Sequence, residues 1–268
     1  MINISGSEVV SAYTSGSEVM FIYNQNNVVW PELYMKWEPS TASGTFTVSG
    51  VTLPLSSYSG YYNGNPVMFS TKNIMTGLSL YTVDDKAFIN ASRITYFETN
   101  LPVLGYRAFS GCSLLTSVSL PNCVSFKTTG SPIWDCGVFA NCSNLETVEL
   151  PELMFIGDTC FENCINLTNI SIPKCSNIGL YAFNHCNSLE SIVLPPVCTF
   201  VGEGAFMYCS SFNTITLLRP SVVYLGGTSV FWSTHLRSIY VPESLVSAYK
   251  VASRWSGYEN IIYPISNS

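Results

Sequence analysis

The sequence predicts a mostly β protein whose centre is a curved solenoid of parallel strands, with an all-β module before it and a short helical cap after it. Two observations of composition support this. Apolar residues make up 47% of the chain and charged residues only 10%, and the abundant Tyr, Phe, Thr, Ser, Val and Ile residues suit half-buried pleated surface. The third observation is a short phrase that recurs at a nearly fixed period, as in repeat architectures.

The recurring phrase is built around a small residue followed by Phe. Its five clearest copies are AFSGCSLLTSVSLP from Ala108, VFANCSNLETVELP from Val138, CFENCINLTNISIP from Cys160, AFNHCNSLESIVLP from Ala182 and AFMYCSSFNTITLL from Ala205. Two degenerate copies flank them, AFINASRITYFET from Ala87 and VFWSTHLRSIYVP from Val230. The Phe residues stand at 88, 109, 139, 161, 183, 206 and 231, with separations of 21, 30, 22, 22, 23 and 25 residues. We therefore expect about seven rungs, a rung being one turn of the solenoid with one of these Phe residues.

Each copy ends in a strand pattern. In LESIVLP, Ile192 and Leu194 alternate with Ser191 and Val193, so that one pair faces the interior and the other faces out. The equivalent inward pairs are Val118 and Leu120, Val148 and Leu150, Ile170 and Ile172, Ile215 and Leu217, and Ile239 and Val241. One unit cannot bury its own apolar face, so neighbouring units must stack.

The strand pattern is followed by a recurring step in which an aliphatic residue precedes glycine. The glycines concerned are Gly157, Gly179, Gly202 and Gly226. We expect glycine there because its backbone adopts shapes that other residues resist. The small residue and Phe that come next place an aromatic ring in the interior.

The pattern IG..AF..C..L..I.LP resembles the BspA-like class of leucine-rich repeats, which occurs in bacterial surface proteins and in phage-encoded proteins. The resemblance covers residues 76–240 and implies a leucine-rich-repeat solenoid that binds other molecules. This chain departs from the pattern at Ala91 and Thr234 in the Cys position, at the extra residues KTTGSPIW of the second full repeat, and at Leu218 in place of Pro. We expect local irregularity at these places.

Residues 241–268 are predicted to cap the solenoid. A helix should begin after Pro242, with Glu243 in its first turn, and end at Gly257. One face of it would carry Leu245, Tyr249, Ala252 and Trp255, and residues 261–263 should form a final short strand. The ending YVP…L…YK.A..W is similar to the closing segment of BspA-like and phage tail-associated repeat proteins.

Residues 1–75 contain no copy of the repeat and are predicted to form a separate β module for attachment or oligomerisation. SGSEVVSAY, SGSEVMFIY and NNVVWP are three short β runs that predict a meander, and two or three further strands should follow, with a turn near Gly64. The opening V…Y…..VVWP resembles the N-termini of structural proteins from phages of gut bacteria.

His185, Cys186 and Glu190 stand close enough in sequence to suggest a catalytic or metal site. Repetition argues against it, because a column of cysteines recurs with the phrase, as expected for small buried residues: Cys112, Cys142, Cys164, Cys186 and Cys209. A second column is formed by Cys123, Cys175 and Cys198. No C-x-x-C pair occurs. We predict free thiols, no metal, no cofactor, no catalytic residues and no enzymatic activity, although His185 and His235 could still be surface contacts.

Net charge and hydropathy argue against two classes of partner, nucleic acids and membranes. The net charge of −6 without any Lys/Arg-rich run does not favour nucleic-acid binding. No apolar span of 18 residues predicts membrane insertion. The first residues lack the features of a secretory signal, from which we expect folding in the cytoplasm with reduced cysteines.

These observations leave two function hypotheses open. In the first, the chain is a non-enzymatic phage virion protein assembled in the host cytoplasm, whose N-terminal module binds other virion proteins while the solenoid recognises a protein or glycan of the host surface. In the second, it is a bacterial cell-surface adhesin or protein-interaction module. The exposed aromatics and the apolar run at residues 19–23 also suggest a homo-oligomer.

Two surfaces are candidates for ligand binding. The first is the outward column of the strands, a polar surface suited to hydrogen bonding, which includes Tyr96, Thr147, Asn169, Ser191 and Thr214. The second is the variable edge around the Ala-Phe step, where aromatic residues stand in aligned or nearby positions: Tyr106, Trp134, Tyr181, Tyr208 and Trp232. Solvated sheet is the plain alternative for the first surface, and partial burial against neighbouring rungs for the second.

Overall fold

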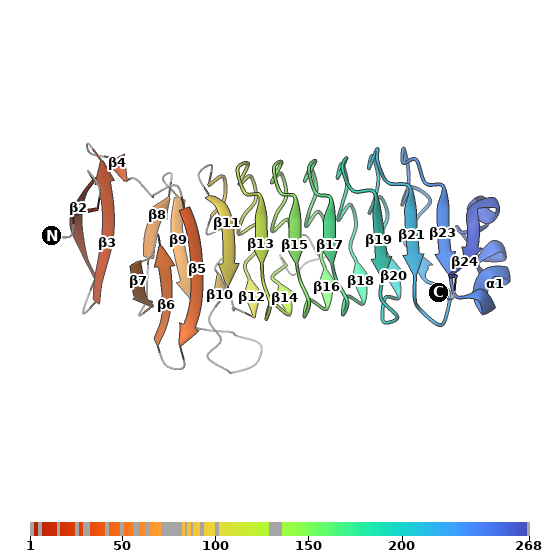
Figure 1. The fold of residues 1–268 in the computed structure, drawn as a ribbon, viewed down its shortest axis with the longest axis horizontal. Coiled ribbons are helices and arrows are strands. Elements are labelled where there is room, and N and C mark those ends of the chain that lie inside the picture. Colours follow the sequence, from red (N-terminus) through yellow and green to blue (C-terminus); the bar gives the residue numbers. More distant parts are fainter. Residues whose placement is uncertain are drawn as a thin grey trace.

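The structure, a computed structural model, describes the strand residues between 3 and 70, residues 82–83, 85–86, 88–91 and 94–99, and residues 102–128 and 136–266. Side chains are described for residues 85–86, 88–91, 97, 102–128 and 136–266. Figure 1 shows the strands standing side by side along one long axis, with the helix α1 at the C-terminal end. The predicted fold class is confirmed: a mostly β, parallel-strand solenoid of about seven turns with one short helix near the C-terminus.

Each rung contributes one strand to a first ladder of parallel strands. In chain order these are β11 (Ile94–Thr99), β13 (Ser117–Ser119), β15 (Thr147–Glu149), β17 (Asn169–Ser171), β19 (Ser191–Leu194), β21 (Thr214–Leu217), β23 (Ser238–Val241) and β24 (Ile262–Pro264). Strand pairing runs from β11 to β17 and again from β19 to β24. Equivalent residues pair in register, as Val148 does with Ile170 and Ile192 with Ile215. All the inward pairs predicted from the repeat are buried, which confirms the alternation.

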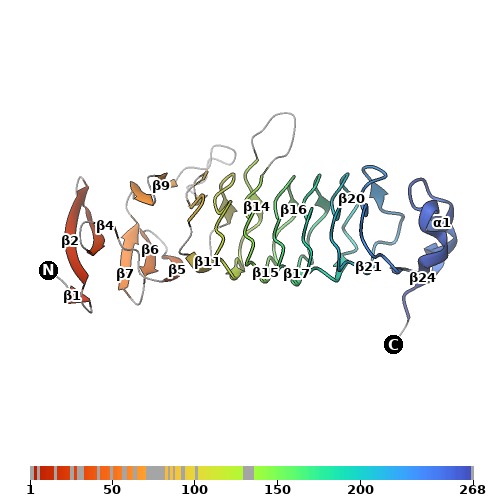
Figure 2. The same cartoon turned by 90° about the horizontal axis from the view of Figure 1, so that it is seen from above.

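A second, shorter ladder lies on another side of the coil and was not predicted. It consists of β10 (Thr82–Val83), β12 (Val103–Leu104), β14 (Ser125–Phe126), β16 (Phe155–Ile156), β18 (Asn177–Ile178), β20 (Phe200–Val201) and β22 (Tyr224–Leu225). Figure 2 shows it from above. Two residues are too few for period-2 alternation to be recognised in a sequence. The ladder comes from the stacking of the rungs.

The repeated Phe residues fill the interior as one continuous stack. From Phe88 to Phe231 the centroids of successive rings lie 5.0–5.8 Å apart, with interplanar angles of at most 19°. The most regular part is the centre, where the rings of Phe161, Phe183 and Phe206 are 5.4 Å apart and within 4° of parallel. In-register stacking of the rungs therefore dictates offset ring stacking, a favourable aromatic geometry.

The physical reason given above for the glycine step is wrong. Among the described glycines, positive φ occurs at Gly111, Gly137 and Gly204, not at the step. A Cβ on Gly202 would lie 2.6 Å from the carbonyl carbon and oxygen of Gly179 in the rung before it. Glycine is required because the backbones of successive rungs approach closely, not because of an unusual dihedral angle.

The described residues among the first seventy form strands that lead into the solenoid. β1 (Asn3–Ile4), β2 (Ser7–Thr14), β3 (Ser17–Asn24) and β4 (Asn27–Val28) make the predicted antiparallel meander. They are followed by β5 (Leu33–Ser40), β6 (Ser43–Val48), β7 (Val51–Leu55), β8 (Ser59–Tyr62) and β9 (Asn65–Ser70), more strands than the two or three predicted. β5 pairs in parallel with β11 and β9 pairs antiparallel with β10, so these strands extend both ladders. The domain boundary at residue 75 stays a prediction, and the turn at Gly64 lies outside the described residues.

The C-terminal cap differs from the single helix predicted. It consists of the 3-10 helix η1 (Glu243–Leu245), the helix α1 (Val246–Val251) and the 3-10 helix η2 (Ser256–Ile261). The helix ends at Val251 because Ala252 is extended, with φ −68° and ψ 143°. This break lets Tyr249 and Trp255 both pack into the core, with their rings 5.2 Å apart and nearly perpendicular. The predicted final strand is confirmed as β24, in register with β23.

Cap side chains also form hydrogen bonds with the last strand of the second ladder, β22, and with Val223 just before it. Trp255 Nε1 donates to the carbonyl of Val223 at 2.7 Å, and Tyr249 Oη accepts the N–H of Val223 at 3.0 Å. Arg254 donates to the carbonyl of Leu225 and, at 2.8 Å, to Tyr224 Oη. These bonds stand in for some of those that another rung would have made to Val223 and Leu225.

Candidate functional site

Around each buried Phe, the residues from three positions before it to two positions after it lie at a turn of the rung, and we call the exposed side of these turns the turn face. In every rung the second residue after Phe has a left-handed backbone, with φ between 58° and 77°: Asn90, Gly111, Asn141, Asn163, His185, Tyr208 and Ser233. We call this row the left-handed column. Such a backbone favours Gly and Asn, so His185 and Tyr208 are unusual occupants. The turn fixes the backbone position of both residues, and neither side chain is part of the buried core.

Backbone hydrogen bonds tie the turn face together from rung to rung. Phe183 donates to the carbonyl of Ala205 at 2.8 Å, and His185 donates to that of Met207 at 2.9 Å. Tyr208 in turn donates to the carbonyl of Trp232 at 2.9 Å. Side chains on successive rungs are therefore held at a fixed spacing.

Three of the aromatic candidates lie on the C-terminal half of the turn face. Trp232 is 60% exposed, and Tyr181 and Tyr208 are each 39% exposed. They occupy different columns, because Tyr181 precedes its Phe by two residues, Trp232 follows it by one and Tyr208 follows it by two. The three residues are therefore near one another on successive rungs, but they do not form one aligned column.

Two of these aromatics have well-defined neighbours. The ring of Tyr208 stacks on His185, with centroids 4.6 Å apart and an interplanar angle of 18°. The ring of Tyr181 covers Gly204 in the next rung, where an added Cβ would lie 2.4 Å from two ring atoms. Neighbouring rungs thus bury one side of each ring, as in the alternative given above for this edge.

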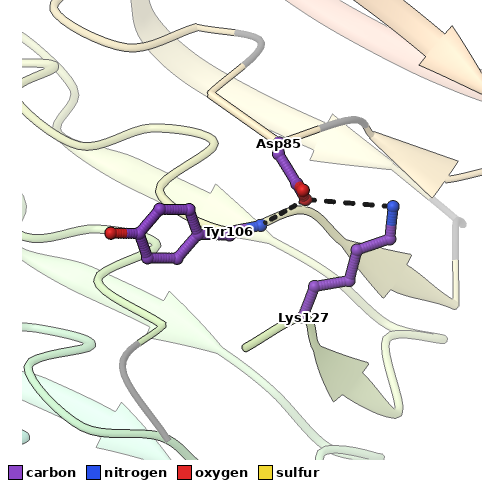
Figure 3. Close-up of polar contacts among 3 residues, drawn as sticks. All are labelled: Asp85, Tyr106 and Lys127. Carbon is purple, nitrogen blue, oxygen red and sulfur yellow. Dashed lines mark hydrogen bonds and ion pairs between the residues drawn. The ribbon is translucent and has the colours of Figure 1, made fainter. Parts of the chain in front are cut away.

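The remaining aromatic candidates lie elsewhere. Trp134 is outside the described residues. Tyr106 belongs to the N-terminal end of the turn face, where its ring is 5.8 Å from Lys86 Nζ and 5.3 Å from Arg107 Cζ. Figure 3 shows its backbone N–H donating to Asp85 Oδ1 at 2.9 Å, while the same carboxylate lies 3.9 Å from Lys127 Nζ. Tyr106 is therefore part of a cationic cluster and not of the C-terminal aromatic group.

The carboxylate of Asp85 illustrates a brace between rungs that the sequence analysis missed. Asp158 Oδ1 accepts the N–H of Leu180 at 2.6 Å, and Glu203 Oε1 accepts that of Ser229 at 3.1 Å. All three acids stand three residues before the Phe of their rung. When the copies are aligned on their Phe residues, the three acids fall at one position. That alignment is the signal from which the brace could have been predicted.

The polar candidates of the strands form the surface expected of them. Thr147, Asn169 and Ser191 are exposed and Thr214 is half-buried. Tyr96 pairs with Ser117 in the same ladder, and its side chain is not among those described. We call this outward surface the sheet face. Its exposed apolar side chains, Val193 and Tyr263, were not singled out as binding residues. Whether any of these residues binds a ligand stays a prediction.

The cysteines have a structural role that exceeds packing. All ten are buried and free. In the first column each thiol donates to the backbone carbonyl of the Phe in the preceding rung, with Sγ–O distances of 3.0–3.2 Å: Cys112 to Phe88, Cys142 to Phe109, Cys164 to Phe139, Cys186 to Phe161 and Cys209 to Phe183. The thiols link successive rungs, which explains why cysteine recurs with the Phe.

Burial keeps these thiols protonated. It raises the pKa of Cys209 to about 12 and that of Cys198, in the second column, to about 11. The pKa of Cys186 is raised well above its ordinary value of 9.0, again chiefly by burial. Because the thiolate is the nucleophile and the metal ligand, such groups are unreactive at neutral pH.

The described side chains and helices bear on metal binding and on membrane insertion. Within that part of the chain no group of three or more His, Cys, Asp or Glu side chains is placed to hold a metal ion. Within the same part, no helix combines the length and the apolar character that a membrane span requires.

Solved structures of leucine-rich repeat proteins are similar to this chain at low sequence identity. A leucine-rich repeat protein from Bacteroides ovatus matches 90% of this chain and 70% of its own, at 19% identity and a TM-score of 0.45. A leucine rich cell surface protein from Faecalibacterium prausnitzii matches 88% of this chain and 72% of its own, at 18% identity and a TM-score of 0.44. A T. pallidum leucine rich repeat protein matches 76% of this chain and 92% of its own, at 17% identity and a TM-score of 0.36. No curated protein sequence matches the chain.

The family is shown by the repeat itself. Its Phe stack, thiol ladder and inward aliphatic pairs recur through the part of the chain that matches the model of the BspA type leucine rich repeat region, residues 68–134 and 135–254. These residues make up more than half of the chain. The chain belongs to the BspA type leucine rich repeat family.

Proposed function

We propose that this chain is a non-catalytic binding module that uses the C-terminal half of its turn face to engage a protein or glycan on a cell surface. The observation that carries the proposal is the exposure of Tyr181, Tyr208 and Trp232 on one part of the solenoid. The core contains the Phe stack and gains little from these rings. Exposed Tyr and Trp residues on a rigid support are typical of contact surfaces.

The chemistry of the other reactive side chains supports binding over catalysis. The thiols donate to backbone carbonyls, and burial keeps them protonated. His185 stacks on Tyr208, and His235 Nδ1 contacts the carbonyl of Ser210. Each of these groups is engaged in holding one rung to the next.

The setting is part of the proposal. We place the chain in a phage virion assembled in the host cytoplasm, with residues 1–75 bound to other virion proteins or to further copies of the chain; the alternative is a bacterial cell surface. Ten buried free thiols support folding in a reducing compartment. Immunogold labelling of phage particles and of bacterial cells with an antibody to the solenoid tests this. Label on intact particles supports the virion setting, and label only on producing cells overturns it.

The binding experiment uses the fluorescently labelled full chain on a panel of gut bacteria and epithelial cells. We expect saturable binding to at least one cell type. The double variant Tyr208→Ser with Trp232→Ser should lose it, whereas Thr147→Ala with Ser191→Ala on the sheet face should retain it. Loss of binding only in the sheet-face variant would move the site to the strands, and absence of binding to every cell type would refute the proposed function.

A further inference from the structure

We propose that the C-terminal end of the turn face is a carbohydrate site, in which the ring of Tyr208 and the indole of Trp232 hold a sugar unit of a neutral glycan. This inference rests on the proposed function and specifies its ligand. It depends on the arrangement of His185, Tyr208, Trp232 and Ser233 in three successive rungs.

We infer that one face of the Tyr208 ring is open. Within the left-handed column, His185 covers the face toward the preceding rung, with centroids 4.6 Å apart. The next rung holds Ser233 in the same column, and a serine side chain is too small to cover the second face. That face is where the flat, C–H-bearing side of a sugar ring can pack.

Trp232 belongs to the next rung, on the side of Tyr208 away from His185. Its carbonyl accepts the N–H of Tyr208 at 2.9 Å, so the two residues are neighbours across adjacent rungs. The indole is 60% exposed although it belongs to a rung whose Phe231 is buried. The phenol and the indole are thus exposed aromatic side chains of adjacent rungs, and in the proposed site they act together as a bipartite aromatic platform.

The platform is rigid before any ligand binds. The backbone of Tyr208 and that of Ser233 have φ of 59°, and backbone bonds hold both neighbouring rungs. Behind them, Phe206 stacks on Phe183 and on Phe231, 5.4 and 5.8 Å away. A preorganised site loses little conformational entropy on binding.

The polar groups at the platform are neutral and available. In the part of the chain that the structure describes, no hydrogen bond is made by the indole N–H of Trp232 or by the hydroxyls of Tyr208 and Ser233. An indole donates, and a hydroxyl both donates and accepts. These capacities match the hydroxyl groups of a neutral sugar, which also donate and accept.

The surroundings favour a glycan over a protein. A stable protein interface buries roughly 800 Å² on each partner around an apolar centre. Along the left-handed column the residues before His185 are three asparagines and a glycine, all uncharged, and Asn163 Nδ2 donates to Asn141 Oδ1 at 3.0 Å. A short aromatic platform continued by amides suits an extended chain of sugars lying along the solenoid.

The test compares five full-length proteins: the unchanged chain, Trp232→Ala, Trp232→Phe, Ser233→His and the control Tyr263→Ala. Ser233→His places a ring over the open face of Tyr208, as His185 does on the other side, and so fills the site without removing an aromatic. Tyr263 is a 42% exposed aromatic on the sheet face. Circular dichroism and thermal melting verify that each variant folds.

Binding is measured on cells that bind the unchanged chain, after periodate treatment, which cleaves sugar diols, or after protease treatment. It is also measured by affinity electrophoresis in gels containing the neutral polysaccharide extracted from those cells. We expect periodate to abolish binding and protease to spare it. Trp232→Ala and Ser233→His should weaken polysaccharide binding by about tenfold or more, Trp232→Phe should weaken it less, and Tyr263→Ala should leave it unchanged.

Binding that survives periodate and is lost after protease identifies a protein partner, which overturns the carbohydrate inference and leaves the proposed function standing. Polysaccharide binding that Ser233→His and Trp232→Ala leave unchanged overturns the site.

Discussion

The ring of Phe183 lies parallel to that of Phe161, with centroids 5.4 Å apart and an interplanar angle of 3°. The thiol of Cys186 donates to the carbonyl of the same Phe161 at 3.2 Å. Each rung thus contacts the preceding rung through both an aromatic face and a thiol. The solenoid is stable because these two contacts repeat together along the chain.

Phe183→Ala tests the interior stack. The ring is fully buried and contacts Phe161 and Phe206, so its removal should lower the free energy of unfolding by roughly 3–5 kcal/mol. Ser191→Ala on the sheet face should change it by less than about 0.5 kcal/mol. Urea denaturation followed by circular dichroism measures both, and equal effects would contradict the assignment of inner and outer residues.

Gly202→Ala tests the close approach of the backbones. The added Cβ would lie 2.6 Å from backbone atoms of Gly179, and the rungs must separate to admit it, at a cost of about 1–3 kcal/mol or more. Gly257→Ala is the matched control, since no atom lies within 4 Å of its added Cβ. The melting temperature should fall in the first variant only. An unaffected Gly202→Ala protein would show that the rungs tolerate wider spacing.

The raised thiol pKa values predict loss of stability in alkali. Burial raises the pKa of Cys123, Cys175 and Cys209 from 9.0 to about 12. The unfolded chain therefore releases these protons above pH 9 while the folded chain keeps them, and the free energy of unfolding should fall as pH rises from 9 toward 12. The slope is up to about 1.4 kcal/mol per pH unit for each thiol.

Urea titrations at pH 8, 9, 10 and 11 measure this dependence. Replacement of Cys123 and Cys175 by Ala should make the decline shallower, because two of the titrating groups are gone. An identical slope in the double variant would assign the alkaline effect to other groups.

Thiol alkylation at a single pH tests the burial of the cysteines directly. Iodoacetamide at pH 8 should add nothing to the native chain and ten adducts to the chain in urea, because all ten thiols are buried. Intact mass spectrometry counts the adducts. Rapid labelling of a thiol other than Cys198, whose pKa of about 11 is the lowest value among Cys123, Cys175, Cys198 and Cys209, would show that its rung opens.

Trp255→Phe tests how the cap ends the ladder. The change keeps an aromatic ring in the core and removes the 2.7 Å hydrogen bond to the carbonyl of Val223. An unsatisfied buried carbonyl costs about 1–3 kcal/mol. Amide exchange should quicken in the last rung, whereas Val251→Ala, at an 81% exposed position, should leave it unchanged. Unchanged exchange in both variants would mean that the bond does not secure the edge.

The sequence by itself determined the repeat, the interior position of the Phe residues and the alternation of the strands. These features depend on spacing, and burial of Ile192 with Ile215 follows once the copies are aligned. It also indicated the final strand and the aromatic character of the turn face. Periodicity is visible in one dimension because every rung obeys the same rule.

Only the tertiary structure decided the contacts between rungs. The second ladder, the thiol bonds to Phe carbonyls and the brace from Glu203 to Ser229 join residues more than twenty positions apart, and they depend on angles that spacing does not contain. The break after Val251 arises because Tyr249 and Trp255 must both reach the last rung. In the same way, the stacking of Tyr208 on His185 joins residues of two different rungs, and only the structure shows it.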